Sequence, residues 1–163
     1  MELDYKTIFK ELNDNGIDYL VVGGLAVNLF GVPRLTYDID LMIHMNPENI
    51  EKLVSKLTRW GYKPKIPVNP LEFADEEKRN LWISEKGMKA FNLFSEHLPI
   101  GEIDIVIYSP IPYKILKERA VKIQIQDIII PVISIHDLIE IKLQTGRKQD
   151  LSDVEYLKKI IEK

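Results

Sequence analysis

One stretch decides the fold of this chain: Val21-Val-Gly-Gly-Leu-Ala-Val-Asn-Leu-Phe-Gly-Val-Pro-Arg-Leu-Thr-Tyr-Asp-Ile-Asp-Leu-Met-Ile43. The apolar residues 17–22 that lead into it predict a buried strand, and Gly23-Gly24 ends that strand in a turn before a short helix over 25–30. Residues 36–43 alternate well enough to predict a second strand. The stretch therefore predicts a strand, a glycine turn, a helix and a second strand in close succession.

Two carboxylates, Asp38 and Asp40, share one face of the second strand, because residues two apart on a strand point the same way. Arg34 and Thr36 extend this face, and Tyr37 is expected on the other side, in the core. Carboxylates held close together raise each other's pKa unless a cation lies between them, and a hard divalent ion such as Mg²⁺ relieves that repulsion. A solvated polar face on an edge strand explains the same pattern without any ligand.

Gly23-Gly24 and Asp104 add to this pattern. Glycines between a strand and a helix let backbone amides approach a ligand, and phosphate is favoured at a helix N-terminus. A turn that simply needs a positive φ is the alternative. Asp104 interrupts the apolar strand expected over 103–107, where a charge costs stability unless it is paired or bound to a metal. The alternative for Asp104 is an exposed face, which the neighbouring Glu102 favours.

The rest of the chain predicts one α+β domain over 1–163, a mixed twisted sheet flanked by helices, with a C-terminal helical segment over about 134–163. Residues 62–80 are expected to form a loop with one strand at most. Two strands are expected within 81–94, around a turn at Glu85-Lys86-Gly87. The remaining helices and the small hairpin follow from apolar spacing, turn residues and a capping box; the helices are expected over 3–15, 47–60, 111–120, 134–145 and 147–163, and the hairpin over 121–132.

The composition excludes several classes of function. Lys and Arg number 22 against 25 Asp and Glu, which gives a net charge of −3 and argues against binding nucleic acid through bulk positive charge. The absence of cysteine excludes disulfides, a thiolate zinc site and a cysteine nucleophile. No apolar run is long enough to span a membrane, and the N-terminus is unlike a secretory signal. We therefore expect a cytoplasmic protein with no membrane partner.

These motifs together resemble the nucleotidyltransferase superfamily, whose members share the DNA polymerase β catalytic fold. The resemblance lies in Gly23-Gly24, thirteen further residues, Asp38-Ile-Asp40, and the later Ile103-Asp104-Ile105. The variant Arg34-x-Thr36-x-Asp38-x-Asp40 is similar to small bacterial and archaeal nucleotidyltransferase-like proteins related to AbiEii toxins. The C-terminal run is similar to that group as well: Asp137-Leu-Ile-Glu-Ile-Lys142, followed by Gly146-Arg147-x-x-Asp150-x-x-Asp153.

The resemblance implies transfer of an NMP group from an NTP such as ATP to an acceptor hydroxyl, with release of pyrophosphate. Asp38, Asp40 and Asp104 would be the catalytic residues and would bind two Mg²⁺ or Mn²⁺ ions. Asp104 would also accept the proton of the attacking hydroxyl. The residues expected to bind the nucleotide and its phosphates are Gly23, Gly24, Arg34, Thr36, Lys142 and Arg147.

Three alternatives stay open at this stage. Instead of binding phosphate, Lys142 and Arg147 could lie on a solvated helix face, with Arg147 paired to Asp150. Asp150 and Asp153 are interpreted as salt-bridge partners rather than ligands. The same fold could be a non-catalytic nucleotide-binding module or an interaction module of a toxin–antitoxin pair, although the complete acid set argues for an enzyme. A structural domain stabilised by metal is the third. The acceptor is a small molecule, RNA or protein, and the chain shows no separate domain to bind it. We therefore expect a homodimer or a small partner protein.

Overall fold

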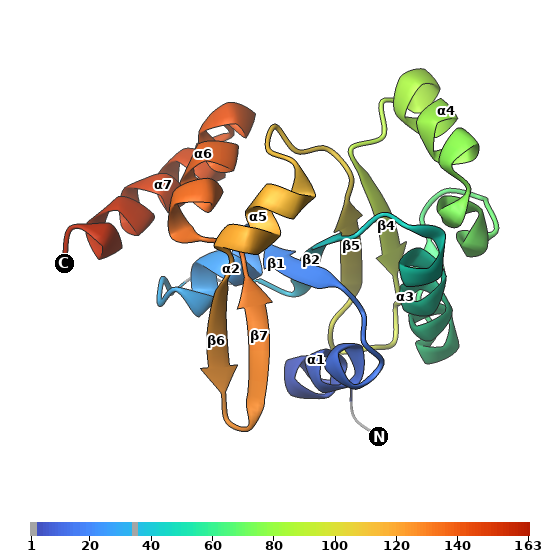
Figure 1. The fold of residues 1–163 in the computed structure, drawn as a ribbon, viewed down its shortest axis with the longest axis horizontal. Helices are drawn as coiled ribbons and strands as arrows, with labels where there is room; N and C mark the ends of the chain where they lie inside the picture. The colour runs from blue at the N-terminus through green and yellow to red at the C-terminus, as the bar shows by residue number, and fades with distance from the viewer. Residues whose placement is uncertain (1–2, 34–35) are drawn as a thin grey trace.

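A single mixed sheet carries the fold in the computed structural model, which describes residues 3–33 and 36–163 (Figure 1). Its strand order is β3-β4-β5-β2-β1-β7-β6. The β2–β5 and β1–β7 pairs are parallel, and the other neighbours are antiparallel. The α+β class expected from the sequence is confirmed. The strands are β1 (Tyr19–Val22), β2 (Asp38–Ile43), β3 (Lys63–Pro64), β4 (Ala90–Phe94), β5 (Glu102–Val106), β6 (Val121–Ile125) and β7 (Ile128–Val132).

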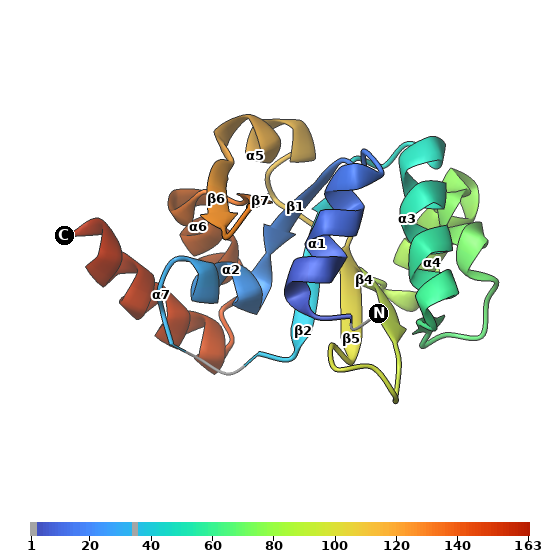
Figure 2. The same ribbon diagram turned by 90° about the horizontal axis from the view of Figure 1, so that it is seen from below.

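Helices flank the sheet and occupy both of its ends. In both views α3 and α4 lie near the end that holds β4, and α6 and α7 lie at the opposite end (Figures 1 and 2). None of the helices in the described ranges is long and apolar enough to cross a membrane. The helices are α1 (Tyr5–Asp14), α2 (Gly23–Leu29), α3 (Pro47–Trp60), the short 3₁₀ helix η1 (Pro70–Ala74), α4 (Glu76–Lys86), α5 (Tyr113–Arg119), α6 (Ile135–Thr145) and α7 (Lys148–Ile161).

The apolar core lies against one face of β2 and β5. Ile39, Leu41, Ile103 and Ile105 are buried there, while the alternate residues of both strands carry acids on the other face. Each large aliphatic side chain buried in this way contributes about 1.5–3 kcal/mol. Burial of one face therefore excludes a slip of one residue in either strand, because such a slip would move the acids into the core.

Local signals set most element boundaries as the sequence predicts. Asp4 caps α1 by accepting a hydrogen bond from the Thr7 amide, at 2.8 Å. Ser134 caps α6 in the same way, through the Asp137 amide at 3.2 Å. The strand, helix and strand around residues 19–43 are present, but Gly23 and Gly24 form the first turn of α2 instead of preceding it, and β2 begins at Asp38 rather than at residue 36.

Two local predictions are wrong. Residues 76–86 form α4, where the sequence predicts a loop up to residue 80 and then the first of two strands, and Gly87, with φ +62°, ends that helix instead of turning a hairpin. Asp75 caps α4, and only Arg79 and Trp82 on it are buried, so the helix carries little apolar periodicity. Tyr37 is 67% exposed rather than in the core, because strand alternation does not extend back beyond Asp38.

Candidate active site

Four carboxylates gather on the face of the sheet opposite the core. Parallel pairing of β2 with β5 sets Asp38 beside Glu102 and Asp40 beside Asp104. Neighbouring strands lie about 4.7–4.9 Å apart, so the acids of each pair raise each other's pKa unless a cation lies between them. The structure therefore brings together the three acids that the sequence singles out, and adds Glu102.

Asp38, Glu102 and Asp104 can share one cation. Each offers a carboxylate oxygen, and the three oxygens lie within 4.8 Å of one another. Oxygen atoms so spaced suit a hard divalent ion, whose bonds to carboxylate oxygen are about 2.0–2.6 Å long. Asp40 adjoins this group, since an interaction with Asp104 lowers its pKa.

Asp104 has the smallest exposed fraction of the four acids, 9%. Burial raises the pKa of its carboxyl to about 8, and the charges of Glu102 and Asp40 act in the same direction. The amide of Asn92, on the neighbouring strand β4, donates a hydrogen bond to Asp104 Oδ1 at 2.7 Å and opposes that rise. The Asn92 amide therefore also fixes how the carboxylate is turned.

Asp40 packs directly against the glycine turn. Gly23 has φ +65°, and a Cβ at this position would lie 2.8 Å from Cγ and 2.9 Å from Cβ of Asp40. Only glycine combines that backbone conformation with so close an approach. Burial raises the pKa of Asp40, whereas a hydrogen bond with the Gly24 backbone lowers it.

At the open end of the cluster, burial and then the charge of Glu102 raise the pKa of Asp38. Lys65 forms an ion pair with Glu102, and its charge partly offsets both acids. Among the described residues this lysine is the cation that pairs with the cluster directly. Four carboxylates beside it retain negative charge that a divalent ion can neutralise.

The loop before β2 is described in part. Arg34, expected to bind phosphate, lies outside the described residues. The Thr36 hydroxyl is within 3.4 Å of the Asp38 carbonyl oxygen, and the Thr36 carbonyl accepts a hydrogen bond from the Tyr5 hydroxyl at 3.2 Å. Thr36 thus lies next to the acidic cluster, tied to α1.

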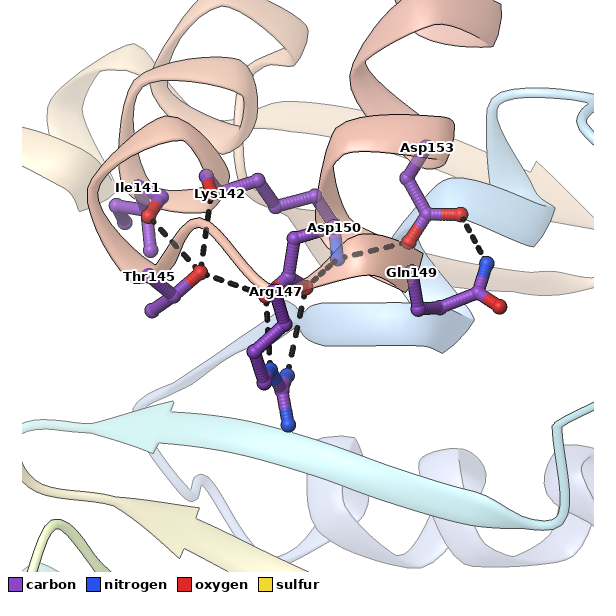
Figure 3. Close-up of polar contacts among 7 residues, drawn as sticks. All are labelled: Ile141, Lys142, Thr145, Arg147, Gln149, Asp150 and Asp153. Atoms are coloured by element: carbon purple, nitrogen blue, oxygen red, sulfur yellow. Dashed lines mark hydrogen bonds and ion pairs between the residues drawn. The ribbon is translucent and has the colours of Figure 1, made fainter.

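Lys142 and Arg147 belong to an ion-pair network at the corner between α6 and α7 (Figure 3). The Lys142 ammonium is buried between Asp150 at 3.3 Å and Asp153 at 3.0 Å. Arg147 holds the other side of Asp150 through Nε, at 2.8 Å, and Nη2, at 3.3 Å. Asp150 and Asp153 are thus salt-bridge partners, as the sequence indicates.

The network also affects the acidic cluster. The charge of Lys142 lowers the pKa of Asp40, and the charge of Asp40 helps to raise the pKa of Arg147. The Arg147 side chain is 78% exposed although its guanidinium is anchored on Asp150. Figure 3 shows it projecting from the α6–α7 corner. It is therefore a fixed positive group open to solvent near the acids.

Glu102, Asn92 and Lys65 are the site residues that the sequence did not identify. Glu102 stands two residues before Asp104, as Asp38 stands two before Asp40, and this spacing is the signal that could have found it. Asn92 and Lys65 carry no such signal, because their positions depend on how β3 and β4 pair with the rest of the sheet.

Comparison with protein families now gives the family. The family described as nucleotidyl transferase AbiEii toxin, type IV toxin–antitoxin system, matches residues 11–161. The chain belongs to the AbiEii nucleotidyltransferase family. Among curated proteins none matches the chain. The family assignment agrees with a glycine turn facing an acid pair on the next strand.

Solved structures show the same fold. The lincosamide antibiotic adenylyltransferase LnuA, bound to lincomycin, is 20% identical with a TM-score of 0.65, over 98% of this chain and 99% of that one. An antigenic nucleotidyltransferase-like protein from Paracoccidioides brasiliensis is 16% identical with a TM-score of 0.58, over 93% of this chain and 72% of that one. At such low identity these likenesses establish the nucleotidyltransferase fold alone.

Proposed function

We propose that the protein transfers an NMP group from an NTP to an acceptor hydroxyl and releases pyrophosphate, with the help of divalent cations. The observation that carries the proposal is the convergence of Asp38, Asp40 and Asp104 from two parallel strands beside the Gly23 turn. In the reaction the acceptor oxygen forms a bond to the α-phosphorus. The bond from that phosphorus to the bridging oxygen breaks, and pyrophosphate leaves.

The acidic cluster fits a divalent metal. Burial and mutual repulsion raise the pKa values of Asp38, Asp40 and Asp104, so the acids lack sufficient compensating charge in the metal-free chain. Two bound Mg²⁺ or Mn²⁺ ions would stabilise the attacking and leaving oxygens of an in-line displacement. Asp38, Asp40 and Asp104 are the proposed ligands, and Glu102 is close enough to join them.

The remaining groups handle the proton and the phosphates. Asp104 accepts the proton of the acceptor hydroxyl once a bound cation holds its carboxyl ionised, and burial, which raises the pKa of this carboxyl in the metal-free chain, makes it a stronger base than an ordinary aspartate. The amides of Gly23 and Gly24 are the proposed donors to triphosphate oxygens, and the Gly24 amide would exchange its present hydrogen bond to Asp40 for one to phosphate. Arg34 and Thr36 are proposed to bind the same phosphates. Arg147, held in place by Asp150, adds positive charge as pyrophosphate departs, and Lys142 contributes charge from its buried position.

The family description also supports a second function, that of a toxin paired with an antitoxin. In that setting the chain could bind nucleotide or a partner protein without transferring a group. The complete set of Asp38, Asp40 and Asp104 favours the enzyme, because carboxylates held this close together cost stability that a site without chemistry has no reason to keep. The proposal includes a cytoplasmic location and an acceptor that is a small molecule, an RNA or a protein.

Label transfer tests the proposal. The protein is incubated with each NTP labelled at the α-phosphate, with Mg²⁺ or Mn²⁺, and with total RNA, the protein itself or lincomycin, the ligand of the similar LnuA structure. We expect metal-dependent labelling of one acceptor class. Thermal unfolding in the same buffers reports nucleotide binding separately, since a ligand that binds only the folded state raises the melting temperature.

Matched variants complete the design. Asp38→Asn and Asp40→Asn should abolish labelling, whereas Asp14→Asn, an exposed acid of α1 paired with Lys10, should leave it unchanged. Labelling that persists in Asp40→Asn contradicts the assigned site. Stabilisation by NTP and Mn²⁺ without labelling of any acceptor favours the binding module.

A further inference from the structure

The two edges of the sheet are built differently. The edge at β3 consists of Lys63 and Pro64, and a short edge with lysine and proline resists pairing with another strand. The edge at β6 runs over residues 121–125 and has no proline, and Figure 1 shows it at the margin of the sheet. Its outer backbone groups therefore have no strand partner within the described chain, and they are available to another strand.

The side chains of β6 make this edge apolar on one face. Val121 and Ile125 are each 37% exposed, and Ile123 between them is half-buried. The same face continues into an apolar pocket of about 360 Å³ between α1, α2 and the hairpin, lined in part by Ile125 and Ile128. Lys122 and Gln124 occupy the opposite face and are exposed.

The sequence of β6 is complementary to itself. When two copies pair antiparallel about Ile123, Val121 of each copy lies opposite Ile125 of the other, and Lys122 lies opposite Gln124. Apolar side chains then meet across the junction, and no like charges face each other. Centring the pair on Lys122 instead would set two lysines opposite each other, which is destabilising.

The ends of the strand favour the same register. Pairing about Ile123 brings the Arg119 end of each β6 to the Asp127 turn of the other copy. Both side chains remain available, since Arg119 is 59% and Asp127 72% exposed despite intramolecular pairs with Asp137 and Lys6. Opposite charges therefore meet at both ends of the junction.

We propose that a second copy of this chain docks on the β6 edge, joining two sheets into one through antiparallel β6–β6 pairing centred on Ile123. Backbone hydrogen bonds across the junction supply the attraction, and the side chains select the register. The assembly is independent of nucleotide transfer, so its test stands apart from that of the proposed function.

Sedimentation of the full chain over a wide micromolar range tests the assembly, with a dimer of twice 18.9 kDa expected. Gln124→Lys sets two lysine pairs across the junction and should weaken association by roughly tenfold, and Gln124→Glu should strengthen it by a similar factor. Residue 124 is exposed, so neither change should unfold the hairpin. Gln144→Lys, at an exposed position of α6, is the matched control and should not alter association.

The opposed responses of the two Gln124 variants identify the register, because a change confined to the monomer would not reverse with the sign of the charge. A monomer throughout the range overturns the proposal and leaves the edge to a strand of a different protein. A dimer on which neither variant acts overturns it as well, because association then uses another surface.

Discussion

Replacing Gly23 with alanine tests the contact on which the candidate site depends. A Cβ at residue 23 would lie 2.8 Å from Cγ of Asp40, whereas carbon atoms in good contact are about 3.5–4.0 Å apart. Asp40 must therefore retreat by about 0.7 Å or more. Misplacement of a catalytic group by about 1 Å can cost roughly a hundredfold in rate, so we expect a loss of this order in label transfer.

The variant also affects stability, because Gly23 has φ +65°. A non-glycine residue in the left-handed region costs about 1–2 kcal/mol. For a domain of this size that corresponds to a melting temperature lower by roughly 2–8 °C. The loss of activity must be separated from this general destabilisation.

Gly87→Ala is the matched control, since Gly87 has φ +62° and a Cβ there meets nothing within 4 Å. Thermal unfolding with and without Mn²⁺ and NTP, together with label transfer, compares the two variants. Both should be destabilised by the positive φ, and Gly23→Ala further by its contact with Asp40, but only Gly23→Ala should lose the stabilisation by Mn²⁺ and NTP. Equal activity and equal ligand response in the two variants would refute the reasoning.

Three further predictions follow from the same contacts. The pKa of Asp104 is raised from 3.8 to about 8 in the folded chain. Between these pH values the folded chain keeps a proton on Asp104 that the unfolded chain has released. The free energy of unfolding of the metal-free protein, measured by urea unfolding, should therefore fall as the pH rises between these values, and it should fall less steeply in Asp104→Asn. Asn92→Ala removes the donor to Asp104 and should weaken Mn²⁺ binding, measured by calorimetry, by roughly ten- to a hundredfold; unchanged affinity would count against a positioning role. Asp150→Ala leaves Lys142 paired with Asp153 alone and should lower the free energy of unfolding by about 1.5–3 kcal/mol, whereas loss of the exposed Arg147 side chain should cost about 0–1 kcal/mol. Equal losses in the free energy of unfolding for the Asp150 and Arg147 variants, measured with urea, would contradict the claim that the buried ion pair of Lys142 stabilises the fold.

The sequence predicts the centre of the site because that centre is local. A strand, two glycines, a helix and an alternating strand follow one another within residues 19–43, and each leaves its own pattern. Asp104 is recognisable because a single charge interrupts an apolar strand. The pair between Arg147 and Asp150 also follows from spacing, since the two residues are three apart, whereas the pair between Lys142 and Asp150 depends on how α6 packs against α7.

Other parts of the site depend on pairing between distant segments. Glu102 becomes a neighbour of Asp38 only through the register of β2 and β5, and no feature of either strand alone specifies that register. Asn92 reaches Asp104 because β4 pairs with β5. The helix over 76–86 is missed for a different reason, since its exposed surface leaves few apolar residues to mark a helical period.

Anomalous scattering from a crystal soaked with Mn²⁺ and an NTP analogue that cannot be cleaved tests most directly whether the acids hold the metal. The predicted result is a manganese peak about 2.0–2.6 Å from carboxylate oxygens of Asp38, Asp40 and Asp104, with the triphosphate beside Gly23. A nucleotide bound without manganese between these acids, or manganese bound only elsewhere on the chain, would contradict the proposed chemistry.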